Sequence, residues 1–425
     1  MAIPVLYQPP TARPRQHRSI FVNDDFRRYF TGDSVSKVGT QISYLALPLL
    51  AIHALHAGPA AVGALGALGS LAFLVIGLPV GAWVERLRRR PVMIAADLVR
   101  AVLLVSLPIT YAFDALSMWQ LYLVVLLVGA GTVFFDVASG AYVPHLVGRR
   151  NLLVANTQLS SMQAGADIAG RSGAGFLVQA FTAPFALVLD ALSYLWSAVC
   201  LISVRKREPR PEPMHDRHLG RDMVAGLRLV LGTGSLRTIA IETSWSNLCL
   251  RMIITLIPVI VVSDLHRSDA WVGVFLAVGG VGVLLGSTWA RRIGARLGYG
   301  RALWVVGAGC APFALLVPLI NAGPAMWISM AGWLMATFKV GVDNVLKVSL
   351  RQRITPDAML SRMGATYRFM ITGALAIGSA AAGVVADATT VRTAVWVAAA
   401  GLAVSWVMLL LSPLRHLREL PEAAA

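Results

Sequence analysis

The chain has 425 residues, of which 57% are hydrophobic and only 14% are charged. Soluble domains carry about a quarter charged residues, so this composition excludes an ordinary soluble enzyme or binding module. A formal net charge of +16 would suggest nucleic-acid binding in a soluble protein, but the positions of the basic residues point to membrane orientation instead.

The chain begins with a polar, basic, proline-containing stretch that has no apolar run typical of a cleavable signal peptide. We expect residues 1–29 to form a cytosolic tail. Apolar runs of about 20 residues then recur, each long enough to cross a hydrocarbon layer of ~30 Å. The first six predicted membrane helices lie near residues 34–56, 60–84, 92–113, 118–142, 152–180 and 185–204.

A polar, proline-containing stretch at 205–235 predicts a cytosolic linker, with a short amphipathic helix near 219–231 on the membrane surface. Six further membrane helices are predicted near residues 238–263, 270–290, 301–320, 325–348, 363–386 and 393–412. We therefore predict an all-α membrane protein of twelve transmembrane helices. Two six-helix bundles, 30–204 and 236–413, are followed by a cytosolic tail, 414–425.

Basic residues are concentrated in alternate loops. We assign 30 of the 37 Lys and Arg residues to the two tails, the linker and the loops on the same side, and only Arg267 and Arg392 to the other side. Cytoplasmic loops carry the excess of Lys and Arg, so both termini are predicted in the cytosol. Three residues also recur after an offset of 205 positions, which favours a duplicated six-helix unit: Gly77, Gly81 and Arg86 recur as Gly282, Gly286 and Arg291.

The loop between the second and third predicted helices, GAWVERLRRR (81–90), resembles a signature of the major facilitator superfamily, Gly-x-x-x-Asp-Arg-x-Gly-Arg-Arg. Gly81, Glu85, Arg86, Arg89 and Arg90 match or keep the charge, while an arginine replaces the second glycine. Three longer segments resemble a bacterial exporter branch that includes enterobactin exporters and macrolide-efflux proteins: 26–50, 134–158 and 349–369. The resemblance implies the major facilitator fold but no particular substrate.

The same resemblance implies a cytoplasmic gate. In this superfamily an acidic residue near the end of the fourth helix engages the basic loop after the second helix. Here that residue is Asp136, and its partners would be Glu85, Arg86 and Arg90. On the tenth predicted helix, Lys339, Asp343 and Lys347 recur every four residues and form a charged stripe. We also assign this stripe to the gate.

Charges inside apolar runs cost roughly 2.5–3.5 kcal/mol each unless they are paired or face water. Asp97 and Arg100 share a helix face, as a local pair or as part of the gate. Asp167 and Arg171 lie in GADIAGRSGAG, which resembles the antiporter signature Gly-Pro-x-x-Gly-Gly with an arginine in place of the proline. This pair either neutralises itself, contacts substrate or carries the coupling proton, for which Glu242 is the second candidate.

The first and seventh helices of this superfamily usually line the substrate cavity. Their polar, charged and aromatic residues suit an amphipathic molecule, although ordinary packing explains the aromatic residues equally well. The candidates are Asp33, Gln41, Tyr44, Trp245 and Asn247. Arg251, near the middle of the seventh helix, is grouped with Asp167, Arg171 and Glu242 as an intramembrane charge.

Motifs of soluble enzymes are absent from the sequence. It contains no phosphate-binding P-loop and no metal-ligand spacing, so we expect no cofactor, no metal and no enzymatic activity. We interpret the chain as a monomeric, proton-coupled exporter of a small organic molecule in the bacterial inner membrane, with substrate, protons and lipid as its partners. A proton-coupled nutrient importer and a non-transporting sensor or scaffold remain the alternatives.

Overall fold

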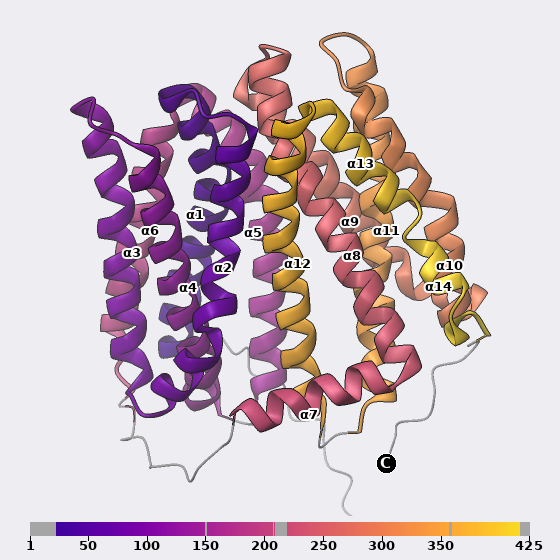
Figure 1. Ribbon diagram of the computed structural model, residues 1–425. Helices are drawn as coiled ribbons and strands as arrows, with labels where there is room; N and C mark the ends of the chain where they lie inside the picture. Colours follow the sequence, from indigo (N-terminus) through magenta and orange to yellow (C-terminus); the bar gives the residue numbers. More distant parts are fainter. Residues whose placement is uncertain (1–22, 149–150, 207, 209–218, 357–358, 417–425) are drawn as a thin grey trace, which may run out of the picture.

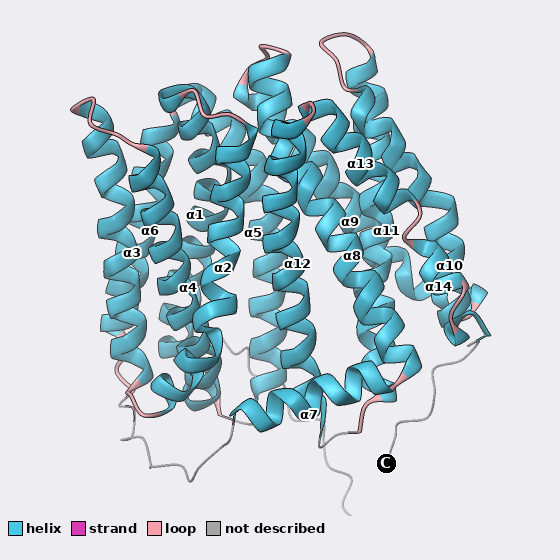
Figure 2. Ribbon diagram, viewed as in Figure 1, coloured by secondary structure: helices cyan, strands magenta, loops and turns pink. Residues whose placement is uncertain are grey.

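The computed structural model describes residues 23–148, 151–206, 208, 219–356 and 359–416, and these residues form helices and loops without a strand (Figure 2). The first half of the chain contains six long helices. They are α1 (Asp24–Leu55), α2 (Pro59–Glu85), α3 (Arg89–Ala112), α4 (Met118–Val147), α5 (Leu152–Phe181) and α6 (Ala183–Ser203). A shorter helix, α7 (Leu219–Gly232), precedes the second half.

The second half contains six further spans, three of which are composite. A π-helical segment extends α8, a 3₁₀ segment extends α10, and α14 continues α13 after a short break. The elements are α8 (Gly234–Pro258), η3 (Val259–Asp264), α9 (Asp269–Leu297), α10 (Tyr299–Cys310), η4 (Ala311–Leu319), α11 (Ala325–Ile354), α12 (Leu360–Ala388), α13 (Val391–Ala403), α14 (Trp406–Leu410) and η6 (Pro413–His416).

Within the described residues, eleven spans are long and apolar enough to cross a membrane. The twelfth long helix, α5, is as long as α4 and α11 at 30 residues but carries many polar side chains. The predicted all-α fold of twelve transmembrane helices is therefore confirmed.

Helix α1 begins at Asp24, earlier than the predicted bundle boundary at residue 30. The side chain of Asn23 accepts hydrogen bonds from the backbone N–H groups of Asp25 and Phe26, at 3.1 and 3.2 Å, and so caps the helix. Phe26 and Tyr29 on this extra turn are buried. Hydropathy missed the turn because charged residues alternate with the aromatic ones.

The two halves lie side by side in Figure 1, with α1–α6 coloured indigo to magenta and α8–α14 coloured red to yellow. They meet where α2 packs on α12 and α5 packs on α9. Helix α7 crosses one end of the bundle. We call this end the α7 end, and the other end the opposite end.

The hydrophobic core is continuous between the halves only toward the opposite end. One large cluster joins residues of both halves, including Leu49 and Leu121 of the first and Leu256 and Phe275 of the second. Two further clusters each belong to one half, one built around Tyr142 and the other within 230–414. The halves are therefore joined by apolar packing at the opposite end and have separate cores at the α7 end.

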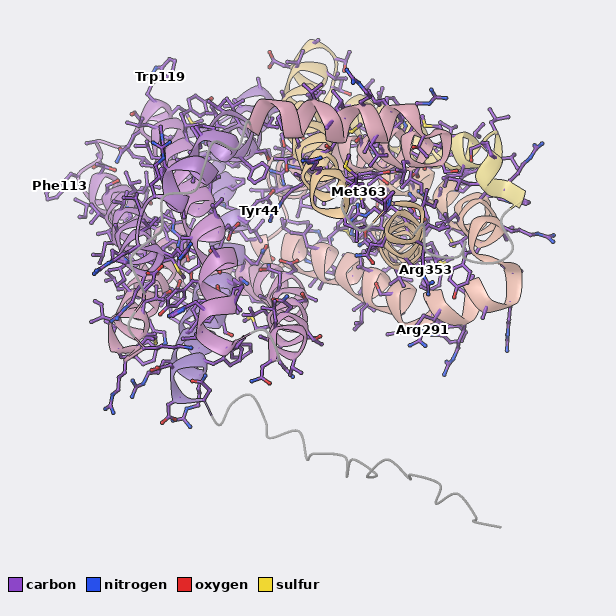
Figure 3. All side chains as sticks on the ribbon, turned by 90° about the horizontal axis from the view of Figure 1, so that it is seen from below. Tyr44, Phe113, Trp119, Arg291, Arg353 and Met363 are labelled. Carbon is purple, nitrogen blue, oxygen red and sulfur yellow. The ribbon has the colours of Figure 1, made fainter. Side chains whose placement is uncertain are left out.

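Many large apolar side chains cover the outer surface. Phe113 and Trp119, which are 79% and 82% exposed, project from the rim of the first half when the bundle is seen from the α7 end (Figure 3). A soluble monomer rarely exposes apolar surface on this scale. Lipid contact accounts for it, and aromatic residues at helix ends suit the membrane interface.

Candidate functional site

Glycines bring the two halves into contact toward the opposite end. A Cβ atom added at Gly63 of α2 would lie 2.7 Å from the Cα atom of Gly383 on α12, and one added at Gly175 of α5 would lie 2.7 Å from the Cα atom of Gly273 on α9. Real Cβ atoms essentially never approach so closely. The two helix pairs that join the halves are therefore in backbone contact there.

The same helices have space toward the α7 end. A Cβ atom added at Gly81 of α2, Gly364 of α12 or Gly165 of α5 would meet no heavy atom within 4 Å. At the opposite end, by contrast, His53 of α1 lies 2.9 Å from the carboxylate of Asp269 on α9. The structure is thus closed at the opposite end and looser at the α7 end.

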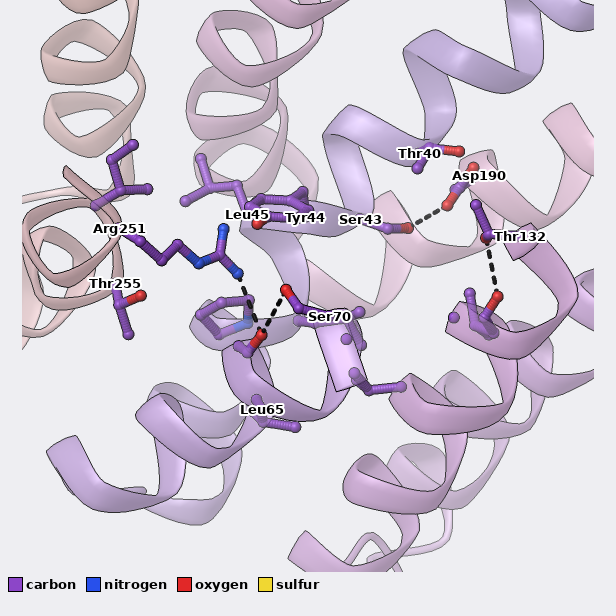
Figure 4. A pocket seen from close by; sticks show the side chains of 18 of the residues that line it. Thr40, Ser43, Tyr44, Leu45, Leu65, Ser70, Thr132, Asp190, Arg251 and Thr255 are labelled. Atoms are coloured by element: carbon purple, nitrogen blue, oxygen red, sulfur yellow. Dashed lines mark hydrogen bonds between the residues drawn. The ribbon is translucent and has the colours of Figure 1, made fainter. Parts of the chain in front are cut away.

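Between the halves lies a cavity of about 280 Å³ (Figure 4). Its wall is mostly apolar, and its polar groups come from both halves. The first half contributes α1, α2, α4 and α6, while α8 and α9 contribute from the second. The polar lining residues are Thr40, Ser43, Tyr44, Ser70, Thr132, Asp136, Asp190, Tyr194, Arg251 and Thr255.

A predicted cavity residue, Tyr44, and a predicted intramembrane charge, Arg251, meet in this wall. The guanidinium carbon of Arg251 lies 4.8 Å from the centre of the Tyr44 ring, a cation–π contact between α8 and α1. The same guanidinium donates to Ser379 Oγ at 2.6 Å and to the carbonyl oxygen of Gly66 at 3.4 Å. Arg251 therefore spans the boundary between the halves inside the cavity.

The acidic residue Asp190 is buried in the first half and accepts hydrogen bonds from two hydroxyl groups. Ser43 donates to one carboxylate oxygen, and Ser193 donates to the other at 3.0 Å. The predicted pair of Asp97 and Arg100 lies on neighbouring α3, with 2.5 Å between the carboxylate and the guanidinium. The two acidic residues are therefore engaged by neighbouring side chains beside the cavity.

Arg100 also anchors the surrounding helices. Its guanidinium carbon lies 4.1 Å from the ring centre of Tyr194 on α6, and one N–H donates to Thr132 Oγ1 on α4 at 3.3 Å. Tyr194 in turn shares a hydrogen bond of 2.9 Å with Thr40 on α1. A charge on α3 thereby positions three helices that line the cavity.

Asp136 lies on the cavity wall and is exposed to it. Among the described residues, no basic side chain comes within ion-pair distance of its carboxylate. Asp136 is thus a carboxylate with access to the cavity and without a direct ion pair in this conformation.

The basic loop has other partners than Asp136 here. Backbone N–H groups of Arg89 and Arg90 donate to the carboxylate of Glu208, at 2.9 and 3.1 Å, which caps the start of α3. The Arg90 side chain donates to the carbonyl oxygens of Leu201 and Ile202 at the end of α6. The side chain of Glu85 lies outside the described residues, and Arg86 is exposed. The predicted gate with Asp136 stays a hypothesis about another conformation.

In the second half, α8 and α11 assemble a buried charged cluster, which we define as Glu242, Lys339, Asp343 and Lys347. The ammonium of Lys339 lies 2.8 Å from Glu242 and 3.0 Å from Asp343. Lys347 contacts both carboxylates as well, at 2.9 Å from Asp343. Ser246 on α8 and Ser405 complete the hydrogen bonding. Two positive and two negative charges therefore neutralise one another inside the second half.

Asp167 on α5 accepts hydrogen bonds from two amides, Gln41 Nε2 at 2.6 Å and Gln163 Nε2 at 2.9 Å. The side chain of Arg171 lies outside the described residues, so the predicted pair is not tested. Asp33 is buried beside Lys37, with 2.9 Å between the charged groups. Neither Asp33 nor Gln41 lines the central cavity.

The other two cavity candidates lie elsewhere on α8. The indole N–H of Trp245 donates to the carbonyl oxygen of Gly401 at 2.8 Å, which ties α8 to α13. Asn247 lines a smaller pocket, beside Asp343 and Lys347. Of the five predicted cavity residues, Tyr44 therefore lines the central cavity, together with Arg251, which was predicted as an intramembrane charge.

Sequence reasoning missed the small hydroxyl residues of the site. Ser43, Ser70, Thr132 and Thr255 line the cavity, and Ser379 holds Arg251. Small polar residues in apolar helices carry little signal in a hydropathy profile. Thr132 and Thr255 lie one helix turn from Asp136 and Arg251, which was the available clue for these two residues.

Two packed bundles around a cavity, with separate cores at one end, define a membrane transporter of the major facilitator type. The family model described as "Transmembrane secretion effector" matches residues 18–424. The chain belongs to that family and is a multi-pass membrane transporter.

Known proteins support this assignment. The enterobactin exporter EntS of Escherichia coli K12 is 26% identical over 360 residues, covering 82% of this chain and 83% of that protein. A bacterial homologue of the iron transporter ferroportin, solved in an inward-facing state, superimposes with a TM-score of 0.74 at 14% identity, covering 91% of this chain and 98% of that one. The nucleoside transporter NupG superimposes with a TM-score of 0.72 at 10% identity, with coverage of 91% and 98%. The predicted resemblance to the enterobactin-exporter branch is confirmed.

Proposed function

We propose that this protein exports a small amphipathic organic molecule from the bacterial cytoplasm by alternating access, coupled to proton entry. The observation that carries the proposal is the cavity between two halves that share a core at only one end. A site of this kind is exposed to one side at a time when the halves rock around it. The similarity to an enterobactin exporter favours export over import.

We assign the α7 end to the cytoplasm. Arg86, Arg205, Arg237 and Arg291 lie in or next to its loops, and cytoplasmic loops carry the excess of positive charge. The described conformation then opens toward the cytoplasm, where an exporter takes up its substrate. Helix α7 would rest on the inner membrane surface.

Cysteine labelling tests this orientation. In a background without Cys200, Cys249 and Cys310, we expect the Ser268→Cys variant to react with a membrane-impermeant maleimide on intact cells. The Arg237→Cys variant should react only after permeabilisation. Both positions are exposed, so accessibility differs only by side. The reverse pattern would place α7 outside and overturn the assignment.

Asp136 is our candidate for the coupling acid. It lines the cavity without a direct ion pair, so it can gain and lose a proton as the cavity changes sides. Glu242 is less suited because two buried lysines already form ion pairs with its carboxylate. Asp167 is the second candidate because, among the described residues, its carboxylate accepts hydrogen bonds from neutral amides only.

Flux in inside-out vesicles tests the coupled transport, with a panel of dyes, antibiotics and siderophores. We expect accumulation that a protonophore abolishes. Asp136→Asn should reduce the rate of uphill transport at least about tenfold. Passive counterflow should continue, because the cavity remains. The control is Asp114→Asn, which removes a loop carboxylate at a positive φ that asparagine also tolerates. Normal uphill transport by Asp136→Asn would move the role to Asp167, and no gradient-dependent flux would refute the function.

A further inference from the structure

Arg251 differs from the other buried cations of the described chain. The basic side chains buried there are Arg100, Arg251, Lys339 and Lys347. Arg100 pairs with Asp97, and the two lysines pair with Glu242 and Asp343. Arg251 is only 8% exposed, and no carboxylate of the described residues lies within ion-pair distance. A charge held in this way within a membrane protein is costly and is a sign of function.

The hydrogen bonds of Arg251 are also incomplete. A guanidinium has five N–H donors, and within the described chain only Ser379 and Gly66 accept from it. In Figure 4 the side chain extends from α8 into the cavity toward Tyr44. Both observed acceptors are neutral. The remaining donors therefore leave room for an acceptor that enters through the cavity.

The surroundings define the rest of the ligand. Aromatic and aliphatic side chains dominate the cavity wall, among them Leu65, Phe73, Val128 and Ile254. The volume of about 280 Å³ suits a small organic body. Arg251 lies on one side of the cavity in Figure 4 and Asp190 on the other, where Asp190 is already engaged by Ser43 and Ser193. An acidic group can thus reach Arg251 without meeting Asp190 directly.

We infer that Arg251 is the anion anchor of the cavity and that the substrate is a small organic anion with an apolar, aromatic body. The inference rests on the proposed transport function and names its substrate class. A carboxylate would accept two parallel N–H bonds from the guanidinium, while the apolar body packs against the wall next to Tyr44.

The anchor also couples binding to movement of the halves. Arg251 belongs to the second half, whereas Tyr44 and Gly66 belong to the first. An anion that takes the N–H group now directed at Gly66 replaces a contact between the halves with a contact to substrate. Binding therefore weakens one of the links between the two halves.

Three naphthalene probes of equal size test the substrate class on the purified protein in nanodiscs. We use 2-naphthoate as the anion, 2-naphthamide as the neutral analogue and 2-naphthylmethylammonium as the cation, and measure binding by calorimetry. We expect the wild type to bind the anion at least tenfold more tightly than the amide, which corresponds to about 1.4 kcal/mol. The cation should bind most weakly.

Variants separate an anchor from a structural role. Arg251→Gln should remove the preference for the anion and leave amide binding unchanged, while Arg251→Lys should keep part of it because the charge remains. Arg292→Gln, an exposed arginine near the α7 end of α9, is the matched control. Equal loss of amide and anion binding in Arg251→Gln would show a structural role, and an unchanged preference would show that Arg251 does not contact the anion. Either result overturns the inference, as does failure of the wild type to prefer 2-naphthoate.

Counterflow of labelled probes in proteoliposomes distinguishes this inference from the proposed function. Selective binding of 2-naphthoate without movement across the membrane would refute transport and leave the anion anchor in place. Movement of the amide in preference to the anion would refute the anchor and leave transport in place.

Discussion

Glu242→Gln is expected to destabilise the folded protein by about 3–5 kcal/mol, because it leaves a net positive charge in a fully buried cluster. Glu242 and Lys339 are both 0% exposed. After the substitution, Asp343 would be the only carboxylate left in the cluster for Lys339 and Lys347. Thermal unfolding followed by size-exclusion chromatography in detergent measures the loss.

A second substitution should restore most of this stability. Glu242→Gln combined with Lys347→Met leaves Lys339 and Asp343 as a neutral pair, with Ser405 still accepting from the lysine. In double-mutant cycles, the effects on stability of two substitutions in one ion-pair network are not additive. Asp264→Asn, at the exposed end of the same span, is the control and should unfold like the wild type. A stable Glu242→Gln protein that transports without proton coupling would instead make Glu242 the coupling acid.

Gly175→Ala should shift the protein toward the conformation that is open at the opposite end. The added Cβ atom would lie 2.7 Å from the backbone of Gly273 and from the carbonyl oxygen of Asp269, so α5 and α9 must separate. Overpacking of this kind costs about 1–3 kcal/mol, which changes a two-state population by about 5- to 150-fold. A cysteine at Ser70, on the cavity wall, should then react faster with an impermeant maleimide from outside.

Gly165→Ala is the matched control for this experiment. It makes the same chemical change on the same helix, but its Cβ atom would meet nothing within 4 Å. Both variants gain the same helix propensity, so a difference between them reports the contact with α9. Equal labelling rates at Ser70 in the two variants would show that the glycine contact does not hold the opposite end closed.

Hydropathy predicted most helix boundaries closely. It failed where tertiary packing buries residues that the local hydropathy pattern marks as polar. Helix α1 begins earlier than predicted because Phe26 and Tyr29 are buried against α4, and Tyr29 bonds Ser139 there at 2.7 Å. Helix α5 was predicted as a span although it is more polar than the others. Its small residues, such as Gly175, make the contact with α9 that holds it in place.

The sequence predicted some residues of the candidate site, but not most of the contacts between them. The sequence identified Asp97 with Arg100 because the two residues are one helix turn apart. It also grouped Lys339 with Asp343 for the same reason. It could not join Glu242 to Lys339, which are 97 positions apart, and it grouped Trp245 with Tyr44 although only Tyr44 reaches the cavity.

The sequence by itself determined the class of this protein: the number of apolar helices, the distribution of charge between loops and the family motifs are local properties of the chain. The tertiary structure alone decided which charges neutralise one another and which buried cation, among the described residues, has no carboxylate within ion-pair distance. Lys339 is paired with Glu242 of α8, while the guanidinium of Arg251, on that same α8, contacts the neutral groups of Tyr44, Ser379 and Gly66 in the described part of the chain. That difference arises because each face of α8 packs against different helices, and no local pattern records which helices those are.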